Sequence, residues 1–266
     1  MGTGERALPP SVSTARPMPD EVPTPGMPSP KPGDQPRATT IVVPRTARYY
    51  RLGPDRPDVR EVWVVCHGYG QLARYFLRPF RAVTGAAEAR LIVAPEGLSR
   101  FYLDGHTGAY DRIGATWMTR DDRLHEIDDQ VTYLDAVLAE VTDGLGAFRL
   151  GVLGFSQGAA TAARWLDRSP LLVARGWHPS RFVVWGADLP HDLDLADAGP
   201  RWLSDADLRL VIGDEDEYAT PDRVRAARER LDAASVPYRH VPYAGGHRIV
   251  EEVLREIIED DPIGSR

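Results

Sequence analysis

The apolar positions of the chain form short runs that alternate with longer segments of helical period. Most runs are solid stretches of Val, Leu, Ile, Phe and Trp, which is typical of strands buried on both faces of a parallel sheet. We predict strands at residues 40–43, 47–52, 61–66, 91–94, 148–153, 181–185, 208–212 and 239–241. We predict helices at residues 72–83, with a bend at Pro79, and at 123–141, 159–166, 221–234 and 248–259. This alternation predicts an α/β fold with a mostly parallel sheet of about eight strands and helices on both faces.

The segment 123–141 is the longest amphipathic stretch. Its apolar residues recur every three or four positions and form one face of a helix. They are Leu124, Ile127, Val131, Leu134, Val137, Leu138 and Val141. His125 and the acidic residues around it fall on the opposite face, so we expect them to be a solvated surface. The helix at 221–234 begins with Pro221 after Thr220, which predicts that Thr220 caps it.

The segment 99–120 interrupts the alternation of strands and helices. It contains Phe101, Tyr102, Tyr110 and Trp117 among Gly, Asp and Arg residues, and its apolar positions have no clear period. It follows the carboxyl end of a predicted strand, which is the edge where open α/β sheets bind ligands. Two interpretations stay open, namely a wall of a substrate pocket and a hydrophobic cluster that holds a long loop down.

The amino-terminal residues 1–37 differ in composition from the rest. They are crowded with Pro, Gly, Ser and Thr and carry few large apolar side chains. Such a segment cannot bury enough surface to offset the entropy lost on ordering. We therefore predict a disordered Pro-rich tail at 1–37 and a single catalytic domain at 38–266. Neither a signal-peptide core nor an apolar run of about 18 residues is present, so we expect a cytoplasmic protein without a membrane span.

Charge and cysteine content narrow the classes of protein further. The formal net charge is −7 and Lys and Arg are not clustered, which argues against a nucleic-acid-binding surface. The single cysteine, Cys66, excludes an intramolecular disulfide and makes a thiolate metal cluster unexpected. Because Cys66 ends an apolar strand, we interpret it as a small buried hydrophobic residue.

The sequence Gly-Phe-Ser-Gln-Gly at residues 154–158 lies between a predicted strand and a predicted helix. Strand, Gly-x-Ser-x-Gly and helix in this order form the nucleophile elbow of the α/β-hydrolase fold. The sharp turn holds the serine in a strained backbone conformation and exposes its hydroxyl. Glycine fills the flanking positions because larger side chains would collide there. Ser156 is therefore the candidate nucleophile.

A serine hydroxyl needs a neighbouring base, and that base needs a carboxylate to orient it. His247 follows the last predicted strand and two glycines, so it is the candidate base. The strand ends offer three acids, Asp216, Asp188 and Asp214. We favour Asp216, because it lies three residues beyond a turn glycine and shortly before the strand that leads to His247. Asp188 precedes a Leu-Pro pair that leads the chain away from the sheet, and we expect Asp214 to support the turn.

The negative oxygen that forms during acyl transfer needs preorganised N–H donors. The residue after the nucleophile, Gln157, supplies one backbone N–H. The loop His-Gly-Tyr-Gly at residues 67–70 follows an apolar strand, and Tyr69 is the most plausible second donor.

At these residues the sequence resembles the phospholipase/carboxylesterase branch of the α/β-hydrolases, which includes acyl-protein thioesterases. The resemblance covers residues 62–253 and rests on four motifs in the same order. They are His67-Gly-Tyr-Gly, Gly154-Phe-Ser-Gln-Gly, Gly213-Asp-Glu-Asp216 and Gly246-His247. In place of the Val-Pro pair that often follows the acid in that branch, this chain has Glu217-Tyr-Ala-Thr-Pro.

The resemblance implies Ser156 as nucleophile, Asp216 as acid and His247 as base, with oxyanion donors at Tyr69 and Gln157. It also implies that Trp117 corresponds to the tryptophan of the family's substrate-side loop, and we add Met118 and Gln71 as candidate substrate-binding residues. The expected activity is hydrolysis of small-molecule carboxylic esters or thioesters, lipid-like ones included, without a metal or cofactor. The alternatives are a peptidase or amidase on the same fold and a hydrolase-like binding module without turnover.

Overall fold

The computed structural model describes residues 37–54, 59–84 and 89–260, and every structural statement below refers to these residues. The chain divides into two compact units, Met1–Arg45 and Thr46–Arg266, and all the strands and helices described below belong to the second. Apart from Arg37, the predicted tail at 1–37 lies outside the described residues. The tail therefore stays a prediction from composition.

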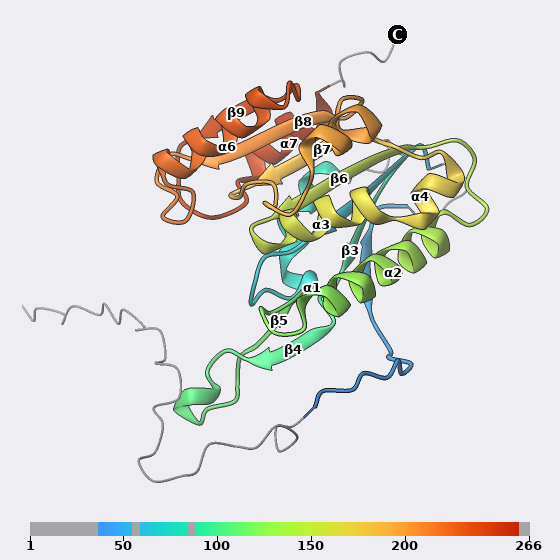
Figure 1. Cartoon of the computed structure of the whole chain (residues 1–266), viewed down its shortest axis with the longest axis vertical. Helices are drawn as coiled ribbons and strands as arrows, with labels where there is room; N and C mark the ends of the chain where they lie inside the picture. Colours follow the sequence, from blue (N-terminus) through green and yellow to red (C-terminus); the bar gives the residue numbers. More distant parts are fainter. Residues whose placement is uncertain (1–36, 55–58, 85–88, 261–266) are drawn as a thin grey trace, which may run out of the picture. The chain divides into compact units, whose positions relative to one another are not determined.

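Seven strands form one sheet in the order β1-β3-β2-β6-β7-β8-β9 (Figure 1). The strands are β1 (Tyr49–Leu52), β2 (Glu61–Cys66), β3 (Arg90–Pro95), β6 (Arg149–Phe155), β7 (Pro179–Trp185), β8 (Asp207–Gly213) and β9 (Arg239–Tyr243). β1 pairs antiparallel with β3, and all other neighbours in this sheet are parallel. The prediction of a mostly parallel sheet is confirmed.

The predicted strand at residues 40–43 is wrong, because the structure has neither helix nor strand at 37–48. Ile41, Val42 and Val43 are between 65% and 94% exposed. Their β-branched side chains favour an extended backbone, but a strand also needs a neighbouring strand and a face to bury. The observed β1 therefore begins only at Tyr49, where β3 provides both.

Alternate side chains of β2 enter two different cores. Val62, Val64 and Cys66 pack on one side of the sheet, and Trp63 and Val65 pack on the other. This two-sided burial explains why the central strands are continuously apolar in sequence. Since the strands are parallel, their carboxyl ends all meet at one edge of the sheet, which brings together the loops after β2, β6, β8 and β9.

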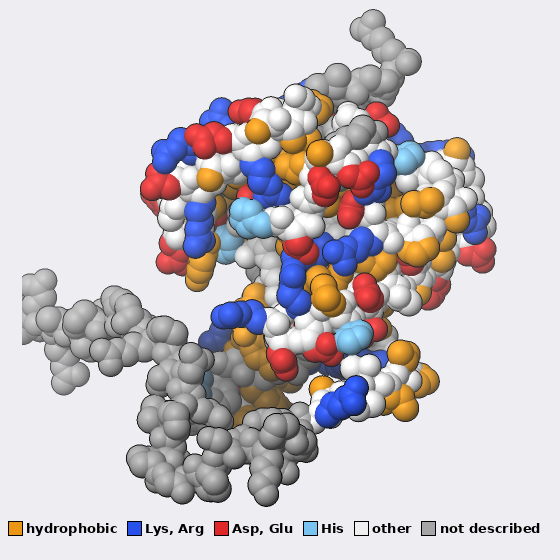
Figure 2. All heavy atoms as spheres, in the orientation of Figure 1, with side chains coloured by type: hydrophobic (Ala, Val, Ile, Leu, Met, Phe, Trp, Pro, Cys, Tyr) orange, Lys and Arg blue, Asp and Glu red, His pale blue; other side chains and the backbone are white. Residues whose placement is uncertain are grey.

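Helices cover both faces of the sheet, as predicted. One face carries α2 (Arg123–Thr142), α3 (Gln157–Arg168), α4 (Pro170–Arg175), α5 (Leu195–Ala198), the π-helical turn η3 (Gly199–Leu203) and α6 (Pro221–Ala233). The other carries α1 (Ala73–Phe76), the 3-10 turn η1 (Pro79–Val83) and α7 (Glu251–Glu259). No helix within the described ranges is long and apolar enough to cross a membrane. On the face in Figure 2, acidic and basic side chains are interspersed.

Some helix predictions need correction. The single helix expected at 72–83 is two short turns, because Pro79 lacks an N–H and its ring blocks continuation of the preceding turn. The helix expected from 248 begins at Glu251, since the N–H of Arg248 donates instead to the carbonyl of Gly246 (2.8 Å). Leu124 is 59% exposed, so the packed face of α2 begins one turn later. The Thr220 side chain makes no capping hydrogen bond.

The irregular loop expected at 99–120 contains a β-hairpin. Its strands are β4 (Ser99–Tyr102) and β5 (Ile113–Thr116), with the 3-10 turn η2 (Gly105–Thr107) between them. The hairpin is held to the loop after β2 by two hydrogen bonds. The N–H of Gly70 donates to the Ala115 carbonyl (2.8 Å), and the N–H of Ala115 donates to the Gln71 carbonyl (3.1 Å). This pairing joins segments far apart in the chain, and local periodicity does not report it.

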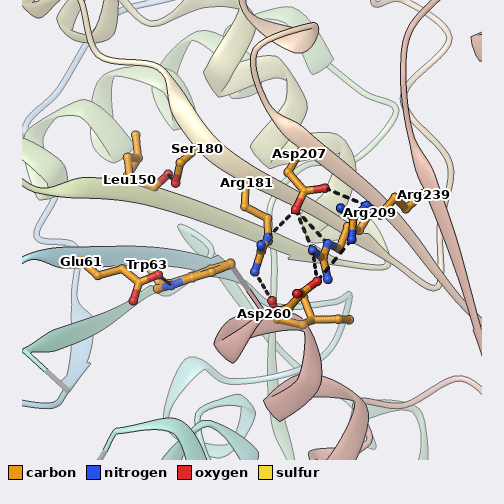
Figure 3. Close-up of polar contacts among 10 residues, drawn as sticks. Glu61, Trp63, Leu150, Ser180, Arg181, Asp207, Arg209, Arg239 and Asp260 are labelled. Carbon is orange, nitrogen blue, oxygen red and sulfur yellow. Dashed lines mark hydrogen bonds and ion pairs between the residues drawn. The ribbon is translucent and has the colours of Figure 1, made fainter. Parts of the chain in front are cut away.

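A buried ion-pair network lies at the opposite, amino-terminal edge of the parallel strands (Figure 3). Asp207 accepts from Arg181 (2.9 Å) and from Arg209 (2.7 Å), and Arg209 also pairs with Asp260 (2.7 Å). Arg181 donates as well to the carbonyl of Ile257 in the last turn of α7. The network therefore ties the end of α7 to β7 and β8, and so fixes the helix that follows the His247 loop.

Candidate active site

Ser156 alone makes the turn from β6 into α3. β6 ends at Phe155 and α3 begins at Gln157, and Ser156 has φ 54° and ψ −120°. Few residues other than glycine adopt a positive φ, and holding one there costs on the order of 1–3 kcal/mol. The strained backbone expected for a nucleophile elbow is therefore present at this serine.

The glycines that flank Ser156 are required by close approach of the backbone. A Cβ on Gly154 would lie 2.3 Å from the Cα of Ala159, inside the following helix. A Cβ on Gly158 would lie 2.2 Å from the carbonyl oxygen of Cys66, at the end of β2. Both distances are far below a normal contact, so any side chain would push α3 away from the sheet.

His247 and Asp216 are joined by a hydrogen bond. The Nδ1–H of His247 donates to Oδ2 of Asp216 at 2.8 Å, because a carboxylate can only accept. The other oxygen, Oδ1, accepts from the backbone N–H groups of Tyr218 (2.9 Å) and Ala219 (3.0 Å). The Asp216 side chain is fully buried, whereas that of His247 is 16% exposed. A fixed carboxylate thus holds the imidazole with its Nε2 available for chemistry.

The imidazole of His247 is confined on several sides. Its ring centre lies 4.7 Å from that of Phe155 and 4.8 Å from that of Tyr218. Gly186, at the end of β7, has φ +62°, and a Cβ there would lie 2.9 Å from Cε1 of His247 and 3.2 Å from Oδ2 of Asp216. The site therefore requires a glycine at this position for both space and backbone conformation.

Ser156 follows Phe155, whose ring contacts the imidazole of His247, and this places the serine beside the pair. Its backbone N–H donates to the carbonyl of Trp185 (2.9 Å), which fixes the turn against β7. The hydroxyl makes no hydrogen bond to another residue in the described part of the chain. In unliganded hydrolases the bond from nucleophile to base is often long and shortens when substrate binds.

The two other candidate acids have different partners. Asp188 accepts from the N–H of Leu189 (2.6 Å) and pairs with Arg230 (3.3 Å), and burial raises the pKa of its carboxyl group. Asp214 accepts from the N–H of Gly245 (2.9 Å) and so supports the loop before the histidine. Of the three acids, Asp216 is therefore the one that the fold brings to the imidazole.

The loop after β2 carries Tyr69, the second expected oxyanion donor. The N–H of Gly68 donates to Oε1 of Gln71 (2.9 Å), that of Gly70 donates to β5 (2.8 Å), and that of Gln71 donates back to Gly68 (3.2 Å). Among the described residues of this loop, the N–H of Tyr69 has no such acceptor. The other expected donor, Gln157, is the first residue of α3, where backbone N–H groups have no partner inside the helix.

Trp117 lies in the core, which differs from its expected place on a substrate pocket. The residue is 1% exposed, and its indole N–H donates to the carbonyl of His67 (2.8 Å). Its backbone N–H donates to Oε1 of Gln157 (3.1 Å), and its carbonyl accepts from Nε2 of Gln130 (2.5 Å). Trp117 thus joins the loop after β2, the elbow and α2, so its contacts are those of a support for the site. For this residue, the interpretation as a tethering cluster is the better one.

Met118 and Gln71, the other candidate substrate-binding residues, are partly buried. The carbonyl of Met118 accepts from Nε2 of Gln157 (2.8 Å), and its sulfur contacts the guanidinium of Arg164 (3.4 Å). Gln71 fixes the loop through Gly68 and also lines a cavity beside it. Gln71 is therefore exposed to a small molecule in that cavity, whereas Met118 lies outside its lining.

Sequence reasoning assigned no role to His67, which is fully buried. Its Nδ1–H donates to the carbonyl of Gly68 (2.7 Å), and its Nε2 accepts from the N–H of Gly97 after β3 (3.0 Å). Burial lowers the pKa of this imidazole, which favours the neutral form that the two hydrogen bonds require. Its place as the first residue of the motif His67-Gly-Tyr-Gly could have indicated this supporting role.

Two predictions about isolated residues are confirmed. Cys66 is fully buried, and burial raises the pKa of its thiol to about 12. His125 has a side chain that is 61% exposed and contacts Asp122 on the outer face of α2. Neither residue contributes to the site, and no group of three or more His, Cys, Asp and Glu residues in the described ranges is arranged to hold a metal ion.

Comparisons with known proteins identify a family and a fold. A family model described as serine hydrolase (FSH1) matches residues 64–251. Esterase PE8 superposes with a TM-score of 0.59 at 19% identity, over 81% of this chain and 99% of that chain. The Zea mays acyl-protein thioesterase 2 gives 0.58 at 19% identity, over 80% and 97%. A phospholipase/carboxylesterase from Dyadobacter fermentans gives 0.55 at 16% identity, over 81% and 97%.

At such low identities the structural likeness establishes the α/β-hydrolase fold and nothing finer. The comparison with curated protein sequences finds no match.

Proposed function

The chain belongs to the FSH1 serine hydrolase family, and on that premise we propose that it hydrolyses carboxylic esters or thioesters through an acyl-enzyme on Ser156. The finer assignment that we propose is an enzyme of the carboxylesterase/phospholipase type with small-molecule acyl substrates. The proposal is supported above all by the 2.8 Å hydrogen bond between Nδ1 of His247 and Oδ2 of Asp216, next to a serine in a strained turn.

In the first half-reaction, Oγ of Ser156 attacks the carbonyl carbon of the substrate while Nε2 of His247 takes the hydroxyl proton. Asp216 keeps the Nδ1–H tautomer and stabilises the imidazolium that forms. The carbonyl oxygen becomes negative and is stabilised by the N–H groups of Tyr69 and Gln157. These donors are fixed before the reaction, because the loop after β2 is held by Gly68–Gln71 contacts and the elbow by α3.

The imidazolium then donates its proton to the departing alcohol or thiol, which completes the first half-reaction and leaves the acyl group on Ser156. Water then attacks the acyl carbon, with His247 again as the base. The acid leaves and the serine regains its proton. Each step needs the imidazole to change protonation state without moving, which the enclosed ring and its buried carboxylate permit.

The test is covalent labelling by a fluorophosphonate probe, which reacts with an activated serine. We expect labelling of the wild type and none of Ser156→Ala. Ser204→Ala is the matched control, because Ser204 is exposed and lies in the loop before β8, and it should label normally. Equal labelling of Ser156→Ala and wild type would refute the assignment of the nucleophile. A panel of nitrophenyl esters, thioesters and one anilide then tests the ester and thioester class against an amidase.

A further inference from the structure

A cavity of about 440 Å³ lies directly beside the loop that carries the proposed oxyanion donor. Its lining comes from three segments, namely the loop after β2, α1 and the hairpin of β4 and β5. Gly70 is part of the lining, and its Cα is about 3.8 Å from that of Tyr69 because the two residues are adjacent. The cavity and the proposed oxyanion donor therefore share the loop after β2.

Two arginines and one aspartate supply the charges of this cavity: Arg74, Arg112 and Asp111. Neither guanidinium forms an ion pair with an acidic side chain in the described ranges. This contrasts with Arg164, which binds both oxygens of Asp192 (3.0 and 2.7 Å). In a chain of net charge −7, a hollow with two unpaired arginines against one acid is a local positive field.

The Arg74 side chain and the backbone at Arg112 each have a fixed neighbour. The guanidinium of Arg74 stacks on the ring of Tyr75 at 4.5 Å, and that of Arg78 stacks on the same ring at 4.7 Å. The backbone N–H of Arg112 donates to the carboxylate of Asp104 (3.1 Å), and this hydrogen bond fixes the backbone at Arg112. Stacked guanidinium groups still present their N–H donors at the edge, where a carboxylate or phosphate binds.

The walls of the cavity also include the apolar side chains of Phe76, Leu103 and Ile113, together with Gln71. A cavity with apolar walls and cationic groups fits a short hydrocarbon chain that ends in an anion. A fully apolar acyl chain would leave both arginines without a counter-charge.

We propose that this cavity binds an anionic group, a carboxylate or a phosphate, at the far end of the acyl part of the substrate. The inference rests on the proposed function, since it assigns the substrate class of the same site. The substrates are then esters or thioesters of acids that carry a second, ionised group. Arg74 and Arg112 bind that group, and the negative charge of Asp111 repels it.

The test compares three nitrophenyl esters with similar acyl chains, namely the neutral butyrate, the glutarate monoester and the 4-phosphonobutyrate. The measured quantity is the ratio of kcat/KM for each anionic ester to that for the butyrate. We expect the wild-type ratio to exceed one in low salt and to fall in about 0.5 M salt, because ions screen the attraction. The glutarate and phosphonate arms decide which anion the cavity prefers.

Single substitutions then assign the effect to the cavity. Arg74→Gln and Arg112→Gln should each lower the ratio about tenfold or more, as loss of a charge-assisted hydrogen bond does. Asp111→Asn should raise it. The matched control is Arg175→Gln, because Arg175 also stacks on an aromatic ring, that of Trp177 (5.6 Å), and lines a separate cavity. Its ratio should not change.

A wild-type ratio of one or below, or an anionic preference that persists in both arginine variants, overturns the inference even if butyrate is cleaved well. If no ester is cleaved, the proposed function fails, and binding decides the inference separately. Calorimetry with glutarate and with phosphonobutyrate should then detect binding to Ser156→Ala that is lost when Arg74→Gln and Arg112→Gln are added. Absence of binding of both anions to Ser156→Ala overturns the inference.

Discussion

Replacing Asp216 by Asn changes the protonation pattern of the site while leaving its shape intact. Oδ1 of the new amide continues to accept from the N–H groups of Tyr218 and Ala219, so the NH₂ group takes the place of Oδ2. That group donates, and Nδ1 of His247 must then accept. The imidazole proton moves to Nε2, which can no longer take the proton of Ser156.

The size of this effect follows from the tautomer. Nε2 must accept a proton before the first tetrahedral intermediate forms. Turnover of the variant therefore requires the rare imidazole tautomer with its proton on Nδ1, which faces the amide NH₂ group and cannot hydrogen-bond to it. The equivalent change in a serine protease lowers kcat about 10⁴-fold, which is about 5.4 kcal/mol of activation free energy. We expect a loss of about 10³ to 10⁴ in kcat here, because Asp216 is likewise a buried carboxylate that accepts from the Nδ1–H of the histidine. The free energy of unfolding should change little, since Asn has the same shape.

The assay is steady-state hydrolysis of a nitrophenyl ester, with the melting temperature as a test of folding. Asp188→Asn and Asp214→Asn are matched controls, because each is an aspartate at a strand end with a partner other than the histidine. Each should lose less than about tenfold in kcat, since neither contacts the imidazole. If Asp216→Asn keeps activity within that range, or Asp188→Asn shows the large loss, the assignment of the acid is wrong.

We make three further predictions, on the nucleophile and base, on Trp117 and on His67. Ser156→Ala and His247→Ala should each lower kcat by several orders of magnitude with folding intact, and the double variant should be little worse than either; additive losses would contradict action as one unit. Trp117→Phe leaves the buried carbonyl of His67 without its donor, so urea titration should show a loss of about 1–3 kcal/mol in unfolding free energy, together with a lower kcat; unchanged stability would show that the indole N–H contributes nothing. Burial lowers the pKa of His67 in the folded state, so below the unfolded value of about 6.5 the unfolded chain binds more protons, and stability should fall with falling pH. Urea titrations of wild type and His67→Gln across that pH range should show a smaller slope for the variant, and equal slopes would exclude this linkage.

Much of the sheet could be predicted because its strands are buried on both faces and are therefore continuously apolar in sequence. The motif at 154–158 was equally informative, since Gly154 and Gly158 are imposed by contacts that any Cβ would violate. The choice of Asp216 followed from its spacing after β8, and the structure brings it to His247. Its catalytic role stays a prediction until the substitutions are measured.

The remaining features depend on contacts that sequence periodicity does not contain. The hairpin of β4 and β5 forms against Gly70 and Gln71, which lie some distance away in the chain. Trp117 has the composition of a pocket residue, but its three hydrogen bonds go to His67, Gln130 and Gln157. The strand expected at 40–43 shows the converse error, since apolar residues without a neighbouring strand stay exposed. In each of these cases, the structure of the segment depends on whether it finds contacts with residues elsewhere in the chain.

The single thiol provides a built-in reporter of opening at the centre of the sheet. Cys66 ends β2, has no solvent-exposed surface and carries a thiol whose pKa is raised to about 12. A thiol reagent can therefore modify the protein only when the packing over Cys66 opens, and the rate of modification measures how often this happens. Every variant discussed above can be ranked for local opening in this way without an engineered label. A bound acyl group that tightens the elbow against the end of β2 should slow the same reaction.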